Sequence, residues 1–131
     1  MILLDTHALV WWLLEPSRLS RRAASAIRRA RRSGGLAIGA MTLWEVAAMF
    51  AGRQLAPRGS VEDSVRTFFE EAGVEVRPLT AEIAALATQF PENFPHDPAD
   101  RLIAATARAE GIPLVTRNER IRQSSLLKTV W

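Results

Sequence analysis

Short apolar runs alternate along this chain with longer segments that carry helical patterning. The runs expected to form strands are residues 1–4, 36–40, 74–77, 113–116 and 128–130. Helical segments of roughly 10 to 15 residues separate most of them, a pattern typical of βαβ units. Such crossovers place helices on both faces of a parallel sheet. We therefore predict an α/β protein, a three-layer α/β/α sandwich with a mainly parallel central sheet of four to five strands.

The helical segments have recognisable ends. Pro16 breaks the first of them, and Ser17 is predicted to cap the second. Glycine follows several of the others, as expected at helix C-termini. The predicted helices cover residues 6–15, 17–33, 42–51, 60–72, 80–90 and 97–110, with one further turn from Asn118.

Length and composition limit the kinds of protein this chain can be. With 131 residues, 48% of them hydrophobic, it fits one compact domain over residues 1–131. The absence of cysteine excludes thiolate metal sites and cysteine nucleophiles, and two histidines cannot form a histidine-rich cage. Any metal is therefore expected to be held mainly by oxygen. No basic segment precedes the first apolar run, and no run reaches the roughly 20 residues of a membrane helix, so we expect a soluble cytoplasmic protein.

The net charge of +3 comes almost entirely from arginine, with sixteen Arg against one Lys. Arginine binds phosphate in a bidentate way, which is compatible with a nucleic-acid partner. Genomic base composition can produce the same bias. The arginine-rich helix over residues 18–32 could follow an RNA backbone. A solvated helix face is favoured, because its arginines point in several directions.

Acidic residues occur where predicted strands end or helices begin, and each has a purely structural alternative. Asp5 follows the first strand and could simply cap the next helix. Glu45 comes three residues after Thr42, which is also the spacing of a capping box. Asp97 stands before a proline at a predicted helix start, so it is explained as a cap, whereas Asp100 is less necessary there.

The carboxyl ends of parallel strands meet at one edge of the sheet, where ligands bind. Carboxylates gathered there repel one another unless a divalent cation neutralises them. Mg²⁺ takes one or two carboxylates and completes its shell with water and phosphate oxygens. The expected chemistry is in-line attack of an activated water on a phosphodiester.

Four stretches together resemble PIN-domain proteins, and most of all the toxins of VapBC toxin–antitoxin pairs. They cover the chain in the family's order. The stretches are Met1-Ile2-Leu3-Leu4-Asp5-Thr6-His7-Ala8, Thr42-x-x-Glu45, the run from His96 to Ala107, and Leu114-Val115-Thr116-Arg117-Asn118.

The resemblance implies a PIN-like fold and an endoribonuclease that depends on Mg²⁺ or Mn²⁺. It also implies a homodimer held inactive by a VapB-type antitoxin. By the same resemblance, Asp5, Glu45 and Asp100 are the expected metal ligands. Thr6 and Thr116 match positions whose hydroxyls lie near the reacting water.

The segment after the last long strand completes the predicted site and contains one departure from the family. Arg117 is expected to bind phosphate, which is our own inference. Asn118 replaces an acid that is common in the family. An amide oxygen can coordinate a cation but brings no charge, so we expect chiefly one metal ion in the absence of substrate. Asp97 is expected to compensate in part.

Two adjacent tryptophans suggest an additional surface. Trp11 and Trp12 cannot both face one core, because neighbouring helix positions point about 100° apart. One of them is expected at a dimer interface or in an antitoxin groove; the alternative is one core anchor with a partly covered neighbour.

Two other functions stay open from sequence alone. The chain could be a structure-specific DNA nuclease with the same metal site. It could also be a weakened or non-catalytic PIN binding module, in which Asn118 marks loss of the site.

Overall fold

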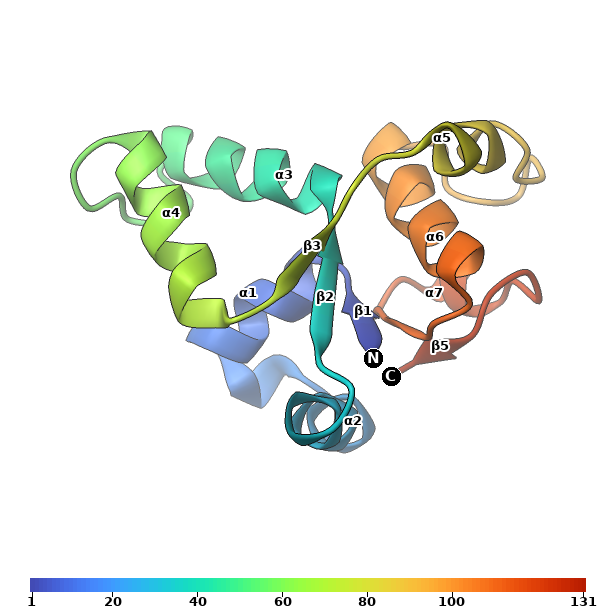
Figure 1. Ribbon diagram of the computed structural model, residues 1–131, viewed down its shortest axis with the longest axis horizontal. Helices are drawn as coiled ribbons and strands as arrows, with labels where there is room; N and C mark the ends of the chain where they lie inside the picture. Colours follow the sequence, from blue (N-terminus) through green and yellow to red (C-terminus); the bar gives the residue numbers. More distant parts are fainter.

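The computed structural model describes all 131 residues, and a five-stranded parallel sheet lies at its centre (Figure 1). The strand order is β3-β2-β1-β4-β5, and every neighbouring pair is parallel. This confirms the predicted α/β fold, and each strand lies within its predicted range. The strands are β1 (Ile2–Leu4), β2 (Leu36–Gly39), β3 (Glu75–Arg77), β4 (Leu114–Val115) and β5 (Thr129–Val130).

All the predicted helices are present, together with a short 3₁₀ turn at Pro16–Arg18. They are α1 (Thr6–Leu14), α2 (Arg21–Arg32), α3 (Ala40–Ala51), α4 (Val61–Ala72), α5 (Ala81–Ala87), α6 (Pro98–Glu110) and α7 (Glu119–Arg122).

Three predicted helix boundaries are wrong. Ser20, not Ser17, caps α2, because its hydroxyl accepts a hydrogen bond from the Ala23 amide at 3.0 Å. Ser17 lies in the 3₁₀ turn instead. Helix α3 begins at Ala40, two residues before the predicted start, and α5 ends at Ala87 instead of continuing to residue 90.

Alternate residues of the inner strands face opposite sides of the sheet, as the period of a β-strand requires. Leu4, Ile38 and Val115 belong to one buried cluster. Their neighbours Leu3, Ala37 and Leu114 belong to a second cluster. Because the strands are paired in register, each face presents a continuous apolar surface.

Helices cover both of these faces. Side chains of α1, α2, α3 and α4 pack in the first cluster, and those of α5, α6 and α7 pack in the second. Figure 1 shows α3 and α4 on one side of the strands and α5 and α6 on the other. The three-layer sandwich is therefore present. None of the helices has the length and apolar character needed to span a bilayer.

The first strand is the middle strand of the sheet. From β1 the chain passes through α1 and α2 to β2 on one side, and later returns through α6 to β4 on the other. Ligands in open α/β sheets bind beyond the carboxyl ends of the strands where the order reverses in this way. Asp5, the residue after β1, therefore lies where a ligand is expected to bind.

Candidate active site at the carboxyl end of the central strand

Asp5 ends the central strand and also caps α1. Its Oδ1 accepts a hydrogen bond from the Ala8 amide at 2.9 Å. Burial raises the pKa of the Asp5 carboxyl, and hydrogen bonds from Thr116 and the Ala8 amide partly oppose this rise. Capping and a position in the site are therefore compatible for this residue.

Glu45 is not part of a capping box, so that alternative is wrong. Helix α3 starts at Ala40, which places Thr42 inside the first turn and not at the cap. The Thr42 hydroxyl is fully buried and lies 3.0 Å from Thr6 Oγ1. Thr6 Oγ1 donates a 2.6 Å hydrogen bond to Glu45 Oε1. The Glu45 carboxylate therefore faces the end of β1.

The start of α6 supplies two further acids. Asp97 is exposed and caps the helix, with its Oδ1 accepting a hydrogen bond from the Ala99 amide at 3.2 Å. Asp100 is half-buried in the first turn. Its pKa is raised to about 6, first by burial and then by the charges of Asp97, Glu45 and Asp5. The acids from three distant segments thus act on one another electrostatically.

The segment after β4 forms the other side of the site. Thr116 is fully buried, and its Oγ1 accepts a hydrogen bond from the Asn118 amide at 3.1 Å. Arg117 is exposed. Asn118 Oδ1 accepts hydrogen bonds from the Arg120 and Ile121 amides at 3.0 and 3.2 Å, which makes it the cap of α7.

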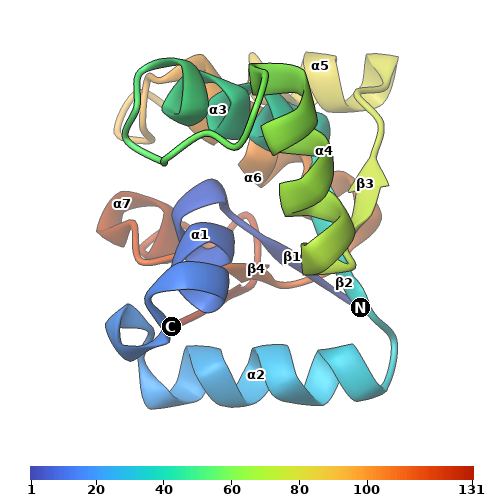
Figure 2. The same cartoon turned by 90° about the vertical axis from the view of Figure 1, so that its left-hand side faces the viewer.

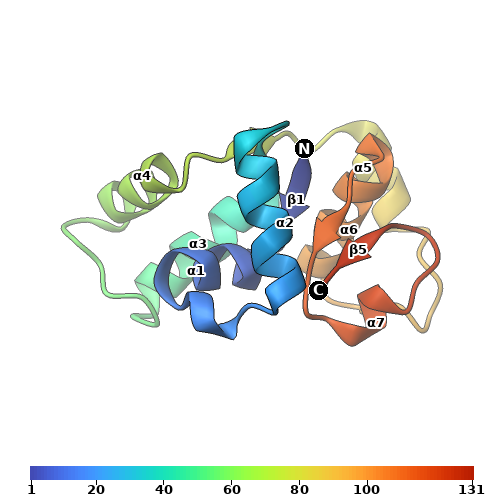
Figure 3. The same cartoon turned by 90° about the horizontal axis from the view of Figure 1, so that it is seen from below.

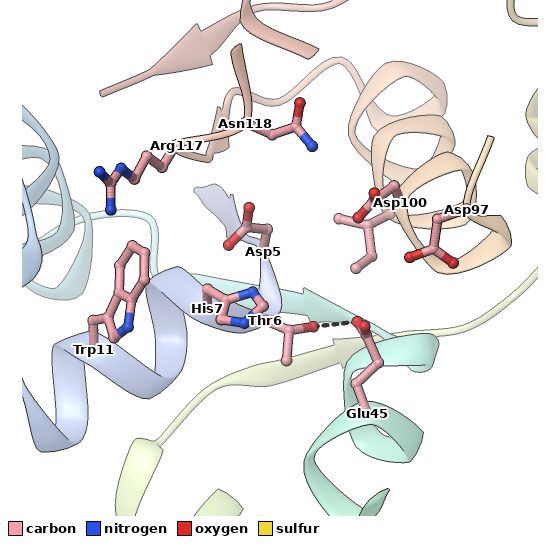
Figure 4. A pocket seen from close by; sticks show the side chains of 10 residues that line it. Asp5, Thr6, His7, Trp11, Glu45, Asp97, Asp100, Arg117 and Asn118 are labelled. Carbon is pink, nitrogen blue, oxygen red and sulfur yellow. Dashed lines mark hydrogen bonds between the residues drawn. The ribbon is translucent and has the colours of Figure 1, made fainter. Parts of the chain in front are cut away.

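This cap changes the chemistry expected of Asn118. Its oxygen already serves two backbone amides, so it is poorly placed to coordinate a cation. Figure 4 shows the amide nitrogen on the side of Asp100. A donor in this position suits a phosphate oxygen better than a metal ion.

A single cleft of about 460 Å³ brings these residues together (Figure 4). Seven of the eight predicted site residues line it, and the eighth, Thr116, is fully buried and hydrogen-bonds to Asp5. The lining residues are Asp5, Thr6, His7, Trp11, Glu45, Asp97, Asp100, Ile103, Arg117 and Asn118.

Three of the lining residues were not predicted. His7 and Trp11 are four residues apart on α1, with ring centroids 5.7 Å apart, so they share the helix face that borders the cleft. Their four-residue spacing just after Asp5 was visible in the sequence. The position of Ile103 in the cleft could not be predicted, because an apolar residue at this point of α6 is typical of the core.

The two adjacent tryptophans match the alternative of one core anchor with a partly covered neighbour, because both pack in or against the same buried cluster. Trp11 is 8% exposed and lines the cleft, whereas Trp12 is half-buried and packs against the cluster around Leu4. The strongly exposed tryptophan is Trp44 on α3, which is 64% exposed.

The donor set suits a hard divalent cation with an incomplete protein shell. Asp5, Glu45, Asp97 and Asp100 supply only oxygen atoms, the ligands that Mg²⁺ and Mn²⁺ prefer. No three acidic or histidine side chains lie close enough to form a ready-made cage. Mg²⁺ does not need one, because it commonly binds one or two carboxylates and keeps several waters.

Comparisons with known proteins agree on the family. The sequence matches the PIN domain over residues 2–125. Ribonuclease VapC22 of Mycobacterium tuberculosis (strain ATCC 25618 / H37Rv) is 37% identical over 134 residues, which cover 99% of this chain and 98% of that protein.

Solved structures also share the fold. VapBC2 from Rickettsia felis, bound to a DNA fragment from its promoter, aligns with a TM-score of 0.72 and 18% identity over 98% of this chain and 97% of that one. A toxin–antitoxin complex from Klebsiella pneumoniae aligns with a TM-score of 0.67 and 19% identity, over 97% and 95% of the two chains. The match over residues 2–125 and the nearly full-length relative lead to one assignment: this chain belongs to the PIN-domain family.

Proposed function

We propose that this protein is an endoribonuclease that depends on Mg²⁺ or Mn²⁺ and acts as the toxin of a type II toxin–antitoxin pair. The observation that carries the proposal is the cleft at the end of β1, where four carboxylates face Arg117 and Asn118. A nearly full-length relative is named a ribonuclease, which supports the same reaction class.

Asp5, Asp100 and Glu45 are the residues that would hold the cation. A divalent ion there would lower the pKa of a coordinated water and neutralise charge that develops on the phosphate. The mutual repulsion that raises the pKa of Asp100 to about 6 also favours a positive ion in this cleft.

The remaining residues would position these ligands and the phosphate. Thr6 fixes Glu45 through its 2.6 Å hydrogen bond, and buried Thr116 would hold Asp5 through a hydrogen bond. Arg117 would bind a phosphate oxygen through its guanidinium. Asn118 would donate from its amide nitrogen, because its oxygen caps α7.

Cleavage of matched RNA and DNA hairpins in Mg²⁺ or Mn²⁺ tests the proposal. We expect the RNA to be cut, the DNA to stay intact, and EDTA to abolish the reaction. Asp5→Asn should remove activity, whereas Asp63→Asn, which changes an exposed aspartate on α4, should not. Unchanged cleavage by Asp5→Asn would refute catalysis at this site. Preferential cleavage of the DNA hairpin would instead identify a DNA nuclease.

An antitoxin and a second copy of the chain are the proposed partners. Structures that share this fold include one described as a toxin–antitoxin complex. Co-expression with the product of the adjacent reading frame should suppress growth inhibition by this protein. Analytical ultracentrifugation should show a dimer, and a stable monomer at high micromolar concentration would contradict that part of the proposal.

A further inference from the structure

The wall of the cleft beside Arg117 is aromatic and basic. Trp11 lies at its centre, with the Arg117 Cζ 5.9 Å and the Arg18 Cζ 4.6 Å from the centroid of its ring. A guanidinium over an indole is held by cation–π attraction while its N–H groups stay available. Arg18 is also paired with Glu15 at 3.6 Å, so Arg117 supplies the guanidinium without an acidic partner. This wall therefore differs from the acidic floor of the same cleft.

The aromatic wall continues out of the cleft through the last residue of the chain. Trp131, which follows β5, packs edge-on against Trp11 with ring centroids 5.9 Å apart and planes at 61°. Trp131 is itself half-buried and lines a second cleft, of about 450 Å³. The two indoles thus form a bridge between the acidic cleft and this second one.

The second cleft is polar and basic. Arg22 from α2 and Arg122 from α7 line it, against one acid, Glu119. Gln123 and Thr129 add uncharged polar groups. Both arginines are exposed and neither has an acidic partner within salt-bridge distance. Their charges are therefore available to an anion.

The position of α2 divides its arginines into two groups. Its N-terminal end lies beside the C-terminus of the chain and its C-terminal end beside the N-terminus (Figures 2 and 3). Past that far end, Gly34 lies against the backbone of Met1, and the Ile2 amide donates a hydrogen bond to the Gly35 carbonyl at 3.3 Å. Arg31 and Arg32 are therefore at the start of β1, away from Asp5, whereas Arg22 is near the cleft.

We propose that the RNA strand leaves the acidic cleft over Trp11 and Trp131 and enters the second cleft. There Arg22 and Arg122 contact phosphates that flank the cut, and a base stacks on the Trp131 ring. Single-stranded nucleic acids are held in this way, by aromatic platforms beside a basic groove. The inference rests on the proposed ribonuclease function and adds a path for the strand.

Binding measured without catalysis tests this path. The probe is a fluorescein-labelled single-stranded RNA of about 12 nucleotides, in EDTA, followed by fluorescence anisotropy across a salt series. Arg22→Gln with Arg122→Gln should weaken binding several-fold and reduce the slope of log affinity against log salt by about 1.4, since each phosphate contact contributes about 0.7. Arg31→Gln with Arg32→Gln is the control of equal charge change and should alter neither quantity.

The Trp131 contact has its own variants. Trp131→Leu keeps an apolar side chain against Trp11 but removes the aromatic ring, and we expect binding about fivefold weaker or more, as stacking of one base requires. Trp131→Phe should restore most of it. An abasic oligonucleotide should bind wild type and Trp131→Leu equally. Thermal denaturation of each variant confirms that it is folded.

Several results would overturn the proposal. They are equal effects of the two arginine pairs, no effect of either pair, or no binding by wild type. A fourth is that Arg22→Gln with Arg122→Gln weakens binding to a poly-glutamate peptide but leaves RNA binding unchanged, which would assign the second cleft to an acidic polypeptide. The cleavage assay with Asp5→Asn is independent. If Asp5→Asn left cleavage unchanged, the ribonuclease proposal would fail. The binding differences between the arginine variants would then still identify a path for RNA on a non-catalytic RNA-binding protein.

Discussion

Thr6 Oγ1 lies 2.6 Å from Glu45 Oε1 and donates a hydrogen bond to it, joining the first turn of α1 to the second turn of α3. The same hydroxyl lies 3.0 Å from Thr42 Oγ1, which is fully buried. Glu45 is therefore held directly by Thr6, and Thr6 is in turn in contact with the buried hydroxyl of Thr42. Its orientation toward Asp5 is a property of this small network.

Replacing Thr6 tests what the network does. Thr6→Val keeps the volume and removes the donor, so the Glu45 carboxylate loses its fixed orientation. Groups that orient a metal-ligating side chain typically contribute 10- to 100-fold in metal affinity or activity. We expect a loss of roughly tenfold in cleavage rate and in Mn²⁺ affinity measured by calorimetry. Thr6→Ser retains the hydroxyl and should stay close to wild type; equal losses in both variants would contradict the role.

Asp100 predicts a pH dependence of the metal-free protein. Its pKa is raised from the ordinary 3.8 to about 6, so the folded state binds this proton more tightly than the unfolded state. The contribution of Asp100 therefore makes the protein less stable as pH rises from about 4 to 6, and the full penalty persists above that window.

Asp100→Asn should consequently stabilise the metal-free protein at pH 8. The shift corresponds to about 3 kcal/mol, which partial exposure reduces to about 1–2 kcal/mol in the free energy of unfolding. Urea denaturation in EDTA should show this gain shrinking as the pH is lowered toward 4. Asp63→Asn is the matched control, expected within about 0.5 kcal/mol of wild type. Destabilisation by Asp100→Asn at pH 8 would be inconsistent with the raised pKa.

Replacing Asn118 with aspartate is expected to strengthen metal binding. Asp caps helices as well as Asn does, so Asn118→Asp should preserve α7 while adding a negative charge to the cleft. We expect Mn²⁺ to bind roughly tenfold more tightly, by isothermal titration, or at a second site. The other asparagine, Asn93, is exposed outside the cleft, and Asn93→Asp should have no such effect. Two tight sites of similar affinity in wild type would disprove the expectation of chiefly one metal ion.

Replacing Arg117 is expected to change KM much more than kcat. If its guanidinium binds the phosphate already in the ground state, Arg117→Gln should raise KM by roughly tenfold, about 1.4 kcal/mol, and change kcat little. Steady-state cleavage of a hairpin RNA measures both constants. Arg120→Gln changes the same charge three residues away, in a different pocket, and should resemble wild type. A fall in kcat alone would place the contribution of Arg117 in the transition state instead.

The strands and the acids could be predicted because their signals are local. Leu3 and Leu4 read as a buried strand, and the structure sends them to opposite faces of the sheet. Asp5 and Asp100 were selected because apolar patterning placed them at a strand end and at a helix start. Their presence in one cleft then followed from the rule for parallel sheets.

The features that sequence reasoning missed depend on contacts between distant segments. Glu45 could not be distinguished from a capping residue, because only the observed start of α3 at Ala40 excludes that role. A helical turn from Asn118 was predicted, but not that the side-chain oxygen of Asn118 would accept hydrogen bonds from two amides of that turn. One of Trp11 and Trp12 was expected at a partner surface, because nothing local indicates that Trp131 packs against Trp11.

The strand order has a consequence for folding during synthesis on the ribosome. The middle strand β1 is synthesised before both of its neighbours, and the neighbour β4 is made only after β2 and β3. A nascent chain that has emerged only through α5 contains Asp5 and Glu45, yet lacks Asp97 and Asp100 and leaves one side of β1 open. The cleft cannot assemble until the segment from α6 to Asn118 has left the exit tunnel, so the order of synthesis delays formation of the acidic site.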